Sequence, residues 1–319
     1  MTVSALHGLE AVKIDVNDAT TAVLSGVGGC RLGIENDLGN VATDGEVYSR
    51  FISLRGQKLM AQFNSMHIAA SLTTCGFGCL RISATGGTKT GLTLYAKKQQ
   101  QGGSRASGSV HNSFNIKQGI LCPRRLTCDH QGDARIEYDA LATYDGTNNP
   151  VVLGANVALP TNPATPERFT LGPISLDLNG TPTTFSGKRG FELDFGHTVE
   201  SVGADSDIWD TFARIVETQP ALILRGIDIS WFGSSAIPLT GVQIDYADTI
   251  VVLQKRAHGG TFVDGATAEH IGIKLAGMGV IENAFDAQGN ATGEVNLRIP
   301  CHFDGTNAPI VIDTTYAYL

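Results

Sequence analysis

Long apolar runs are missing from this chain. The longest unbroken stretches have only a few residues, such as IVVL at 250–253, whereas a helix that crosses a bilayer needs about 20 apolar residues. We therefore expect no membrane span. The first fifteen residues, MTVSALHGLEAVKID, lack a basic start followed by an apolar core and a small-residue cleavage site. This predicts no secretory signal and synthesis in a cytoplasm.

Charged and aromatic residues are also few. Charged residues make up 17% of the chain, and 31 acids outnumber 23 bases to give a net charge of -8. Tight binding of nucleic acid depends on clustered Lys and Arg, so this balance opposes it. Aromatic residues are 7% of the chain, and the two tryptophans are Trp209 and Trp231. Sugar sites usually use aromatic platforms, so a tandem carbohydrate-binding module is disfavoured.

Cysteines are few, with six in the chain. Without a secretory context we expect all six to be free thiols. Two pairs have the spacings C-x3-C and C-x5-C, which fit structural zinc sites poorly, so we expect buried thiols and no metal. The six are Cys30, Cys75, Cys79, Cys122, Cys128 and Cys301.

Common catalytic motifs are absent. The chain has no P-loop, no H-E-x-x-H and no G-x-S-x-G, and GVGGCRLG at 26–33 lacks the G-x-G-x-x-G spacing of dinucleotide-binding turns. The acidic group Asp205, Asp207 and Asp210 has oxygens that suit calcium, but we interpret it as the acidic start of a helix. We therefore predict no enzyme activity, no catalytic residues and no cofactor.

What the chain does have is glycine and short apolar runs. Its 38 glycines, with Asn, Asp and Thr clusters between the runs, indicate many strands joined by tight turns. We predict a mainly β fold.

The clearest feature is an internal repeat. YDGTNNPVVL at 144–153 recurs as FDGTNAPIVI at 303–312, an offset of 159 residues (304 − 145) between Asp145 and Asp304. Apolar residues alternate in the same phase before both motifs, which indicates one buried and one exposed face for the same strand in each copy. They are Ile136, Tyr138, Ala140, Ala142 and Tyr144 in the first copy, and Val295, Leu297, Ile299, Cys301 and Phe303 in the second.

The fronts of the two copies also correspond. VKIDVN at 12–17 matches ISLDLN at 174–179, and GCRLGI at 29–34 matches GFELDF at 190–195. A proline-rich segment lies between the copies and resembles a stiff linker. We predict two tandem homologous β-sandwich or barrel modules, at 1–160 and 173–319, separated by a linker at 161–172.

Each module is expected to hold one short α-helix. In the second copy, Ile208, Phe212, Ile215 and Val216 recur at helical spacing. The equivalent helix in the first copy is expected around Val47, Phe51 and Leu54. A further helix is considered in the first copy, with Leu59, Phe63, Met66 and Ala70 on one face.

Two long polar loops are the candidate contact sites. AKKQQQGGSRASGS at 96–109 has its counterpart in QKRAHGGTFVDGATA at 254–268. Long loops without secondary structure are usually functional or disordered, and a mobile hairpin tip remains an equal alternative. We predict that basic side chains in these loops meet an acidic surface of a neighbouring subunit. They are Lys97, Lys98, Arg105, Lys255 and Arg256.

The chain resembles the major tail (tail tube) proteins of long-tailed bacteriophages, in the type with two modules. The resemblance lies in module size, in the β-rich pattern with a short helix, and in the run GLTLYAKKQQQGGSRASGSVHNSFNIKQGIL at 91–121 followed by YDGTNNPVVL. It implies a structural virion protein whose rings stack into a tube, the conduit for DNA ejection. Three copies would form a ring with pseudo-sixfold symmetry.

The resemblance also implies partners. These are other copies of the chain and other phage tail proteins, such as tape measure and terminator, while DNA passes the lumen without specific binding. An acidic lumen would repel DNA phosphates. Two alternatives stay open: a double-jelly-roll capsid protein, and a tandem carbohydrate-binding or adhesion module.

Overall fold

The computed structural model describes residues 6–16, 19, 21–41, 48, 51–83, 89–99, 111–160, 167–177, 182–203, 207–228, 243–245, 249–257, 259–275, 278–280, 282–287, 293–303, 305–306 and 308–318. In these ranges the chain is antiparallel β-structure with a single helix, α1 (Ile68–Cys75). The prediction of a mainly β fold is confirmed. No helix in the described ranges is long and apolar enough to cross a membrane.

One five-stranded sheet comes from the first half of the chain. Its strand order is β2-β1-β6-β7-β10. Apolar side chains alternate along its strands, and Ile14, Leu92 and Leu94 are fully buried, so one face of the sheet packs on the core. The strands are β1 (Leu6–Asp15), β2 (Ala22–Leu24), β6 (Gly91–Gln99), β7 (His111–Ile116) and β10 (Val151–Val157).

A second five-stranded sheet has the order β12-β11-β18-β19-β23, the same succession as the first. Its register also agrees: Phe114 pairs with Leu153 in the first sheet, and Ile273 pairs with Ile312 in the second, both 159 residues later. A tandem duplication predicts such a match. The strands are β11 (Arg168–Asp177), β12 (Pro182–Thr184), β18 (Thr249–Arg256), β19 (His270–Leu275) and β23 (Ile310–Tyr316).

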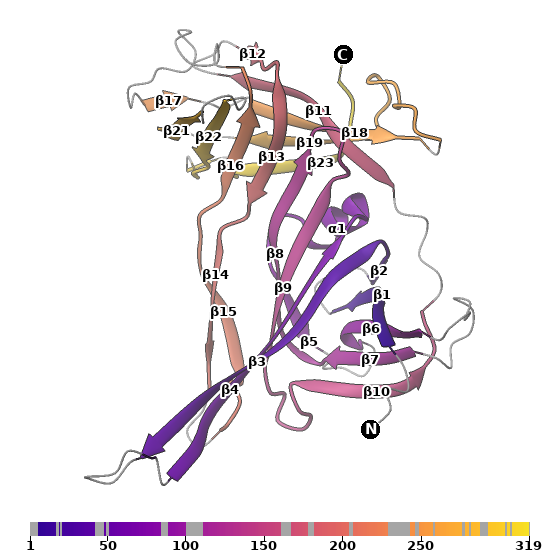
Figure 1. Cartoon of the computed structure of the whole chain (residues 1–319), viewed down its shortest axis with the longest axis vertical. Coiled ribbons are helices and arrows are strands. Elements are labelled where there is room, and N and C mark those ends of the chain that lie inside the picture. The colour runs from indigo at the N-terminus through magenta and orange to yellow at the C-terminus, as the bar shows by residue number, and fades with distance from the viewer. Residues whose placement is uncertain are drawn as a thin grey trace.

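The largest sheet draws strands from both halves, in the order β21-β22-β16-β13-β8-β9-β4-β3, with β5 also paired to β8. It runs through the middle of the molecule, with the first five-stranded sheet at the lower right and the second at the top (Figure 1). The strands are β3 (Val27–Val41), β4 (Phe51–Ser65), β5 (Leu80–Ser83), β8 (Gln118–Asp129), β9 (Arg135–Ala142), β13 (Lys188–Asp194), β16 (Ala221–Gly226), β21 (Glu282–Asp286) and β22 (Glu294–Pro300).

Two hairpins extend from this sheet. Strands β3 and β4 run as a long arm to the lower left of Figure 1, and β14 (His197–Val202) with β15 (Phe212–Thr218) continues the β13 and β16 pair in the same general direction. A short pair, β17 (Gln243–Asp245) and β20 (Met278–Val280), completes the described strands. Both arms therefore end far from the five-stranded sheet of the second half.

A single hydrophobic core joins the two halves. Phe63 and Tyr138 lie directly opposite each other on β4 and β9, and their ring centroids are 5.1 Å apart. Phe191 and Phe195 from the second half belong to the same cluster and are fully buried. Because each buried aromatic side chain contributes about 1.5–3 kcal/mol, the large sheet stabilises both halves together.

The predicted helix positions are wrong. Ile208 precedes β15, while Phe212, Ile215 and Val216 lie in it, and Leu54 lies in β4. Spacings of four residues suit one face of a strand as well as a helix, so the pattern could not separate them. Phe51 also begins β4, and Val47 lies outside the described residues.

The further helix is misplaced as well. Leu59 and Phe63 lie in β4 and Met66 follows it, so of the four residues only Ala70 belongs to α1. The position 161 residues after α1 falls outside the described residues, so a helix in the second half is not described.

Two further expectations need correction. Cys79 and Cys122 form a disulfide bond, which joins the start of β5 to β8, so not all six cysteines are free. Residues 168–172 of the expected linker belong to strand β11, while 161–166 lie outside the described residues. The strand starts before the proline at 173 because its bulge between Leu171 and Ile174 accommodates that residue.

Candidate assembly interface

The two halves meet where β8 pairs with β13. Five residue pairs join the strands, among them Leu126 with Leu193 and Thr127 with Glu192. Leu126 and Leu193 are both fully buried. We call this pairing the inner junction. It makes one continuous sheet from the strands of both halves, and it shows that a strand of one half can extend the sheet of the other.

Ion pairs flank the inner junction. The Arg125 guanidinium bonds Glu137 at 2.7 Å within the first half and lies 4.0 Å from Glu192 of the second half. The hydrogen bond to Glu137 raises the pKa of Arg125. Arg225 of β16 reaches Asp129 of β8 at 2.8 Å. Such partly exposed pairs add little free energy each, but they favour one register of the two strands.

An aromatic contact fixes the tip of the β14–β15 hairpin to the first half. The Trp209 indole N–H donates to the Gln57 side-chain oxygen at 2.9 Å, and the Trp209 ring lies 5.4 Å from the Tyr144 ring. Backbone bonds support it, because Gln57 N–H donates to the Ile208 carbonyl and Tyr144 N–H to that of Asp210, both at 2.8 Å. The tip of the hairpin therefore contacts the first half, in addition to the pairing of β13 with β8 at the other end of the hairpin.

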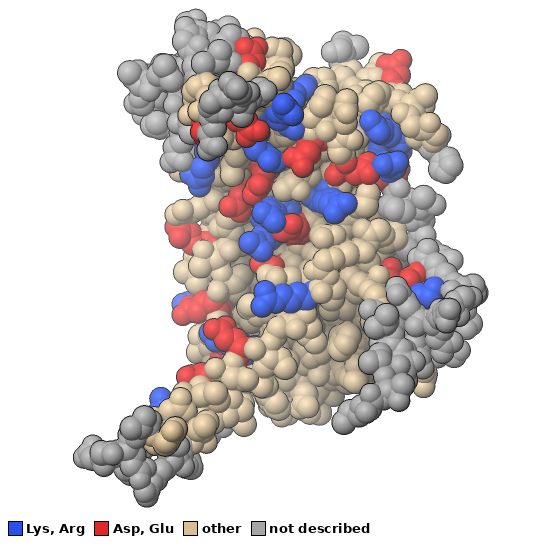
Figure 2. Space-filling model, in the orientation of Figure 1, with Lys and Arg blue, Asp and Glu red and all other residues tan. Residues whose placement is uncertain are grey.

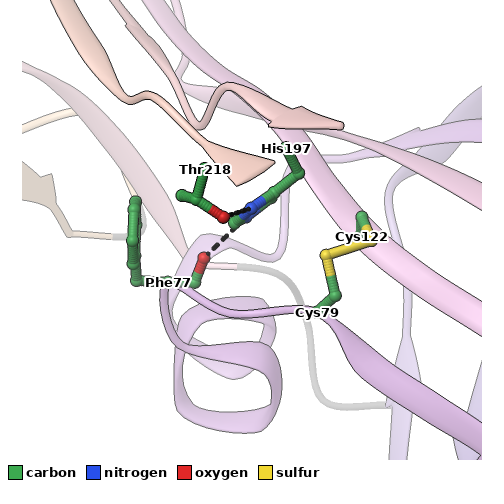
Figure 3. The surroundings of a disulfide bond; sticks show 5 residues. All are labelled: Phe77, Cys79, Cys122, His197 and Thr218. Atoms are coloured by element: carbon green, nitrogen blue, oxygen red, sulfur yellow. Dashed lines mark hydrogen bonds between the residues drawn. A yellow bond between two sulfur atoms is a disulfide. The ribbon is translucent and has the colours of Figure 1, made fainter. Parts of the chain in front are cut away.

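His197 makes a third contact between the halves, beside the disulfide (Figure 3). Its Nε2 lies 2.9 Å from the Phe77 carbonyl oxygen and its Nδ1 lies 3.0 Å from the Thr218 hydroxyl. Burial lowers the pKa of His197. A neutral ring suits this site, since one nitrogen donates to Phe77 while the other accepts from Thr218. The nearby Cys79–Cys122 bond holds the segment that carries Phe77.

The two ends of the large sheet are open edges. Within the described residues, β3 pairs only with β4 and β21 only with β22. Phe285 on β21 is 50% exposed and Ile34 on β3 is 56% exposed. Unpaired strand edges with apolar side chains are templates for pairing with another chain. The open edges are therefore the candidate sites for assembly.

The basic residues predicted as contact sites are scattered. Lys97 is half-buried on β6, Arg105 and the Lys98 side chain lie outside the described residues, and Arg256 covers the Phe262 ring at 5.0 Å. Lys255 bonds Glu167 at 2.7 Å and Glu269 at 2.8 Å.

These two contacts explain the state of Lys255. Burial alone would lower its pKa, but the hydrogen bonds to Glu167 and Glu269 outweigh burial and raise it. The ammonium is therefore already neutralised within its own chain. The role of the loops in contacts between subunits stays a prediction.

A cleft of about 550 Å³ lies between the large sheet and the β14–β15 hairpin. Its walls carry both signs of charge, including Arg124, Asp139 and Arg298. Burial raises the pKa of Asp139. Among the described residues no group of three or more His, Cys, Asp or Glu is arranged to hold a metal ion.

The acidic group expected at a helix start has a different setting. Asp210 accepts a hydrogen bond from the Ser201 hydroxyl across the β14–β15 hairpin. Asp207 is exposed and Asp205 lies outside the described residues. The interpretation as a helix N-terminus is wrong, because the strand β15 follows.

No family model matches the chain. The curated proteins likewise give no match.

Proposed function

We propose that the chain is a structural virion protein that assembles into stacked rings, the tube of a phage tail through which DNA is ejected. The observation that supports this best is the inner junction. It joins two halves of the same strand order edge to edge and leaves an open edge at each end of the combined sheet. If the two end strands match the two strands of the inner junction, copies of the chain can join head to tail by the same pairing. A closed ring then leaves no strand edge unpaired.

The size of the sheet favours three chains per ring. Its continuous path has eight strands, so three chains supply 24. At about 4.8 Å per strand, 24 strands enclose a circle roughly 37 Å across, or about 48 Å with strands tilted by ~40°. Inward side chains remove about 10 Å, which leaves a channel of roughly 27–38 Å, wide enough for duplex DNA to pass.

Two chains give a poorer fit. Their 16 strands would enclose a circle of about 24–32 Å and leave roughly 14–22 Å after side chains are counted. Duplex DNA would then touch the wall throughout. The estimate therefore supports the trimeric ring with pseudo-sixfold symmetry.

The lumen in this proposal is lined by the face of the large sheet that the five-stranded sheets leave open. That face carries both acids and bases, such as Glu137, Glu192 and Arg225. Over the face in view in Figure 2, acidic and basic side chains are mixed. A strongly acidic lumen does not follow from this sheet. Basic residues that are paired with acids would still leave few free cations to hold DNA.

Electron microscopy of the purified protein at rising concentration tests the proposal. We expect rings of three chains with a channel wide enough for duplex DNA, and tubes of stacked rings. Closed shells or flat hexagonal sheets would favour a capsid protein instead. Monomers at all concentrations would contradict self-assembly and return attention to a binding module.

A further inference from the structure

The registers of the large sheet repeat between the halves. Leu32 pairs with Ala61 between β3 and β4, and residues 161 positions later, Leu193 and Leu222, pair between β13 and β16. In the same way Leu126 pairs with Ile136 between β8 and β9, and residues 159 positions later, Phe285 and Val295, pair between β21 and β22. Strand β3 is thus equivalent to β13, and β21 to part of β8.

This equivalence allows the register of the inner junction to be applied to a junction between two chains. Leu193 faces Leu126 at the inner junction, so Leu32 of one chain faces Phe285 of the next. Glu192 faces Thr127 there, so Arg31 faces Asp286.

The exposure of these residues fits a missing neighbour. Leu126 is fully buried at the inner junction, whereas the equivalent Phe285 is 50% exposed at the open edge. Phe195 is fully buried, whereas the equivalent Ile34 is 56% exposed. The same positions are apolar in both halves, but only the set at the inner junction is covered. A second copy of the chain is the occupant that would cover the other set in the same way.

Charge complementarity supports the same register. Asp286 lies directly opposite Glu294 on the neighbouring strand, and both side chains are exposed. Like charges in this position destabilise a strand pair. Arg31 of the next chain would arrive beside these two acids on the third strand. Its guanidinium would replace a repulsion within the chain by an attraction between chains.

The hairpin tips repeat the pattern with aromatic residues. Val41 pairs with Phe51 at the tip of the β3–β4 hairpin, and residues 161 positions later, Val202 and Phe212, pair at the tip of β14–β15. Tyr48 therefore occupies the position of Trp209.

The acceptor of the aromatic contact is repeated as well. Tyr144, against which Trp209 packs, corresponds to Phe303 at the offset of 159, and the turns that follow hold Gly146 at φ 86° and Gly305 at φ 95°. Tyr48 is 84% exposed and Phe303 is 64% exposed. Exposed aromatic rings at equivalent positions are suited to pack on each other between chains.

We infer that β3 of one chain pairs antiparallel with β21 of the next, with Arg31 opposite Asp286 and Leu32 opposite Phe285, and that Tyr48 packs against Phe303 across the same boundary. The partner surface is a second copy of this chain. The inference rests on the proposed ring and adds its register and its anchoring residues.

Oxidative cross-linking of a variant with Leu32→Cys and Phe285→Cys, in a Cys30→Ser background, tests the register. Cβ atoms of directly opposed residues lie about 4.5–5.5 Å apart, close to the separation that a disulfide requires. We expect copper-phenanthroline oxidation of assembled rings to give covalent dimers and trimers on a non-reducing gel. Either of the two cysteines alone in the same background should give none. Leu32→Cys with Asp286→Cys, one residue away on the other face, should cross-link poorly.

Microscopy of the same sample separates the two levels of the proposal. Rings with cross-links support the register. Rings without cross-links, or with equal cross-linking by Asp286→Cys, would overturn the register and leave the tube intact. Absence of rings in the unmodified protein would overturn both.

A matched pair of aromatic substitutions tests the hairpin contact. Tyr48→Ala should weaken association about tenfold or more, as truncation of a central aromatic anchor does, and leave the melting temperature of the free chain unchanged. Trp209→Ala, the equivalent change at the inner junction, should lower that melting temperature. Sedimentation velocity and thermal unfolding give the two readouts. Unchanged association in Tyr48→Ala and Phe303→Ala would overturn this contact.

Discussion

Reversal of the charges at the open edges gives a quantitative test of the inferred boundary between chains. Arg31→Asp removes the inferred attraction to Asp286 and places an acid against two others, Asp286 and Glu294. An opposite-charge pair across strands contributes about 0.2–1 kcal/mol, and a like-charge pair costs a similar amount. The swing is about 0.4–2 kcal/mol per boundary, or roughly 2- to 30-fold in association.

The reverse change at the partner position has a different effect on the free chain. Asp286→Arg replaces the repulsion from Glu294 by an attraction, so the free chain should be as stable as before or slightly more. Association should still fall, because two arginines would face each other between chains. Arg31 lies opposite the uncharged Gln62 in its own hairpin, so Arg31→Asp should leave the free chain unaffected.

The double variant tests whether Arg31 and Asp286 face each other between chains. With both charges reversed, attraction between chains returns, and we expect assembly close to that of the unmodified protein. Sedimentation velocity at low and high salt measures this, since about 1 M salt shortens the screening length to roughly 3 Å and should reduce all differences. If the double variant associates no better than Arg31→Asp alone, the two residues do not face each other and the reasoning fails.

Two further predictions concern the stability of the free chain. Reduction of the disulfide, or Cys79→Ser with Cys122→Ser, should lower the free energy of unfolding by up to about 4 kcal/mol, the loop-entropy value for a separation of 43 residues. Thermal unfolding with and without reductant checks this, with Cys301→Ser as a control. Burial would raise the pKa of Asp15, but hydrogen bonds from Thr21, Lys13 and Thr90 outweigh it and hold the pKa well below its usual range. Stability from this carboxylate is therefore full above about pH 4 and lost as the pH falls towards the folded pKa, so Asp15→Asn should destabilise the chain at neutral pH and flatten its acid unfolding.

Period-two alternation made the β fold predictable from the sequence. The strand that holds Ile136, Tyr138 and Ala140 appears where its pattern indicated, with those residues buried. Helices were not predictable, because residues four apart share a face in either structure. Phe212 and Val216 lie on a strand of the hairpin and are exposed. Their spacing therefore did not reflect a helix face packed against the core of their own half.

Contacts between the halves were beyond the sequence for a different reason. Strand β8 pairs with β13 of the other half as well as with β9. Neither sequence indicates the pairing with β13, since pairing between distant strands depends on the whole topology. The disulfide was missed because spacing alone does not give connectivity. The sequence shows that Trp209 is aromatic, but its contact with Gln57, 152 residues away, arises only from the three-dimensional fold.

Two similar halves within one chain would reduce the number of associations that the proposed ring needs. A ring of six separate modules would need six associations, whereas three fused chains need three, because the inner junction forms within each chain at a high effective concentration. The advantage holds only if the open edges do not compete for the inner junction. During folding, β3 of another chain could approach β8 in place of β13.

The charges at the equivalent positions oppose that error. Arg31 would then occupy the place of Glu192, which lies 4.0 Å from Arg125, so two cations would meet. Conversely, β13 placed against β21 would set Glu192 opposite Asp286, so two acids would meet. Each wrong pairing is repulsive where each correct pairing is attractive. The difference in charge between the two halves at these positions would therefore favour a single order of halves around the proposed ring.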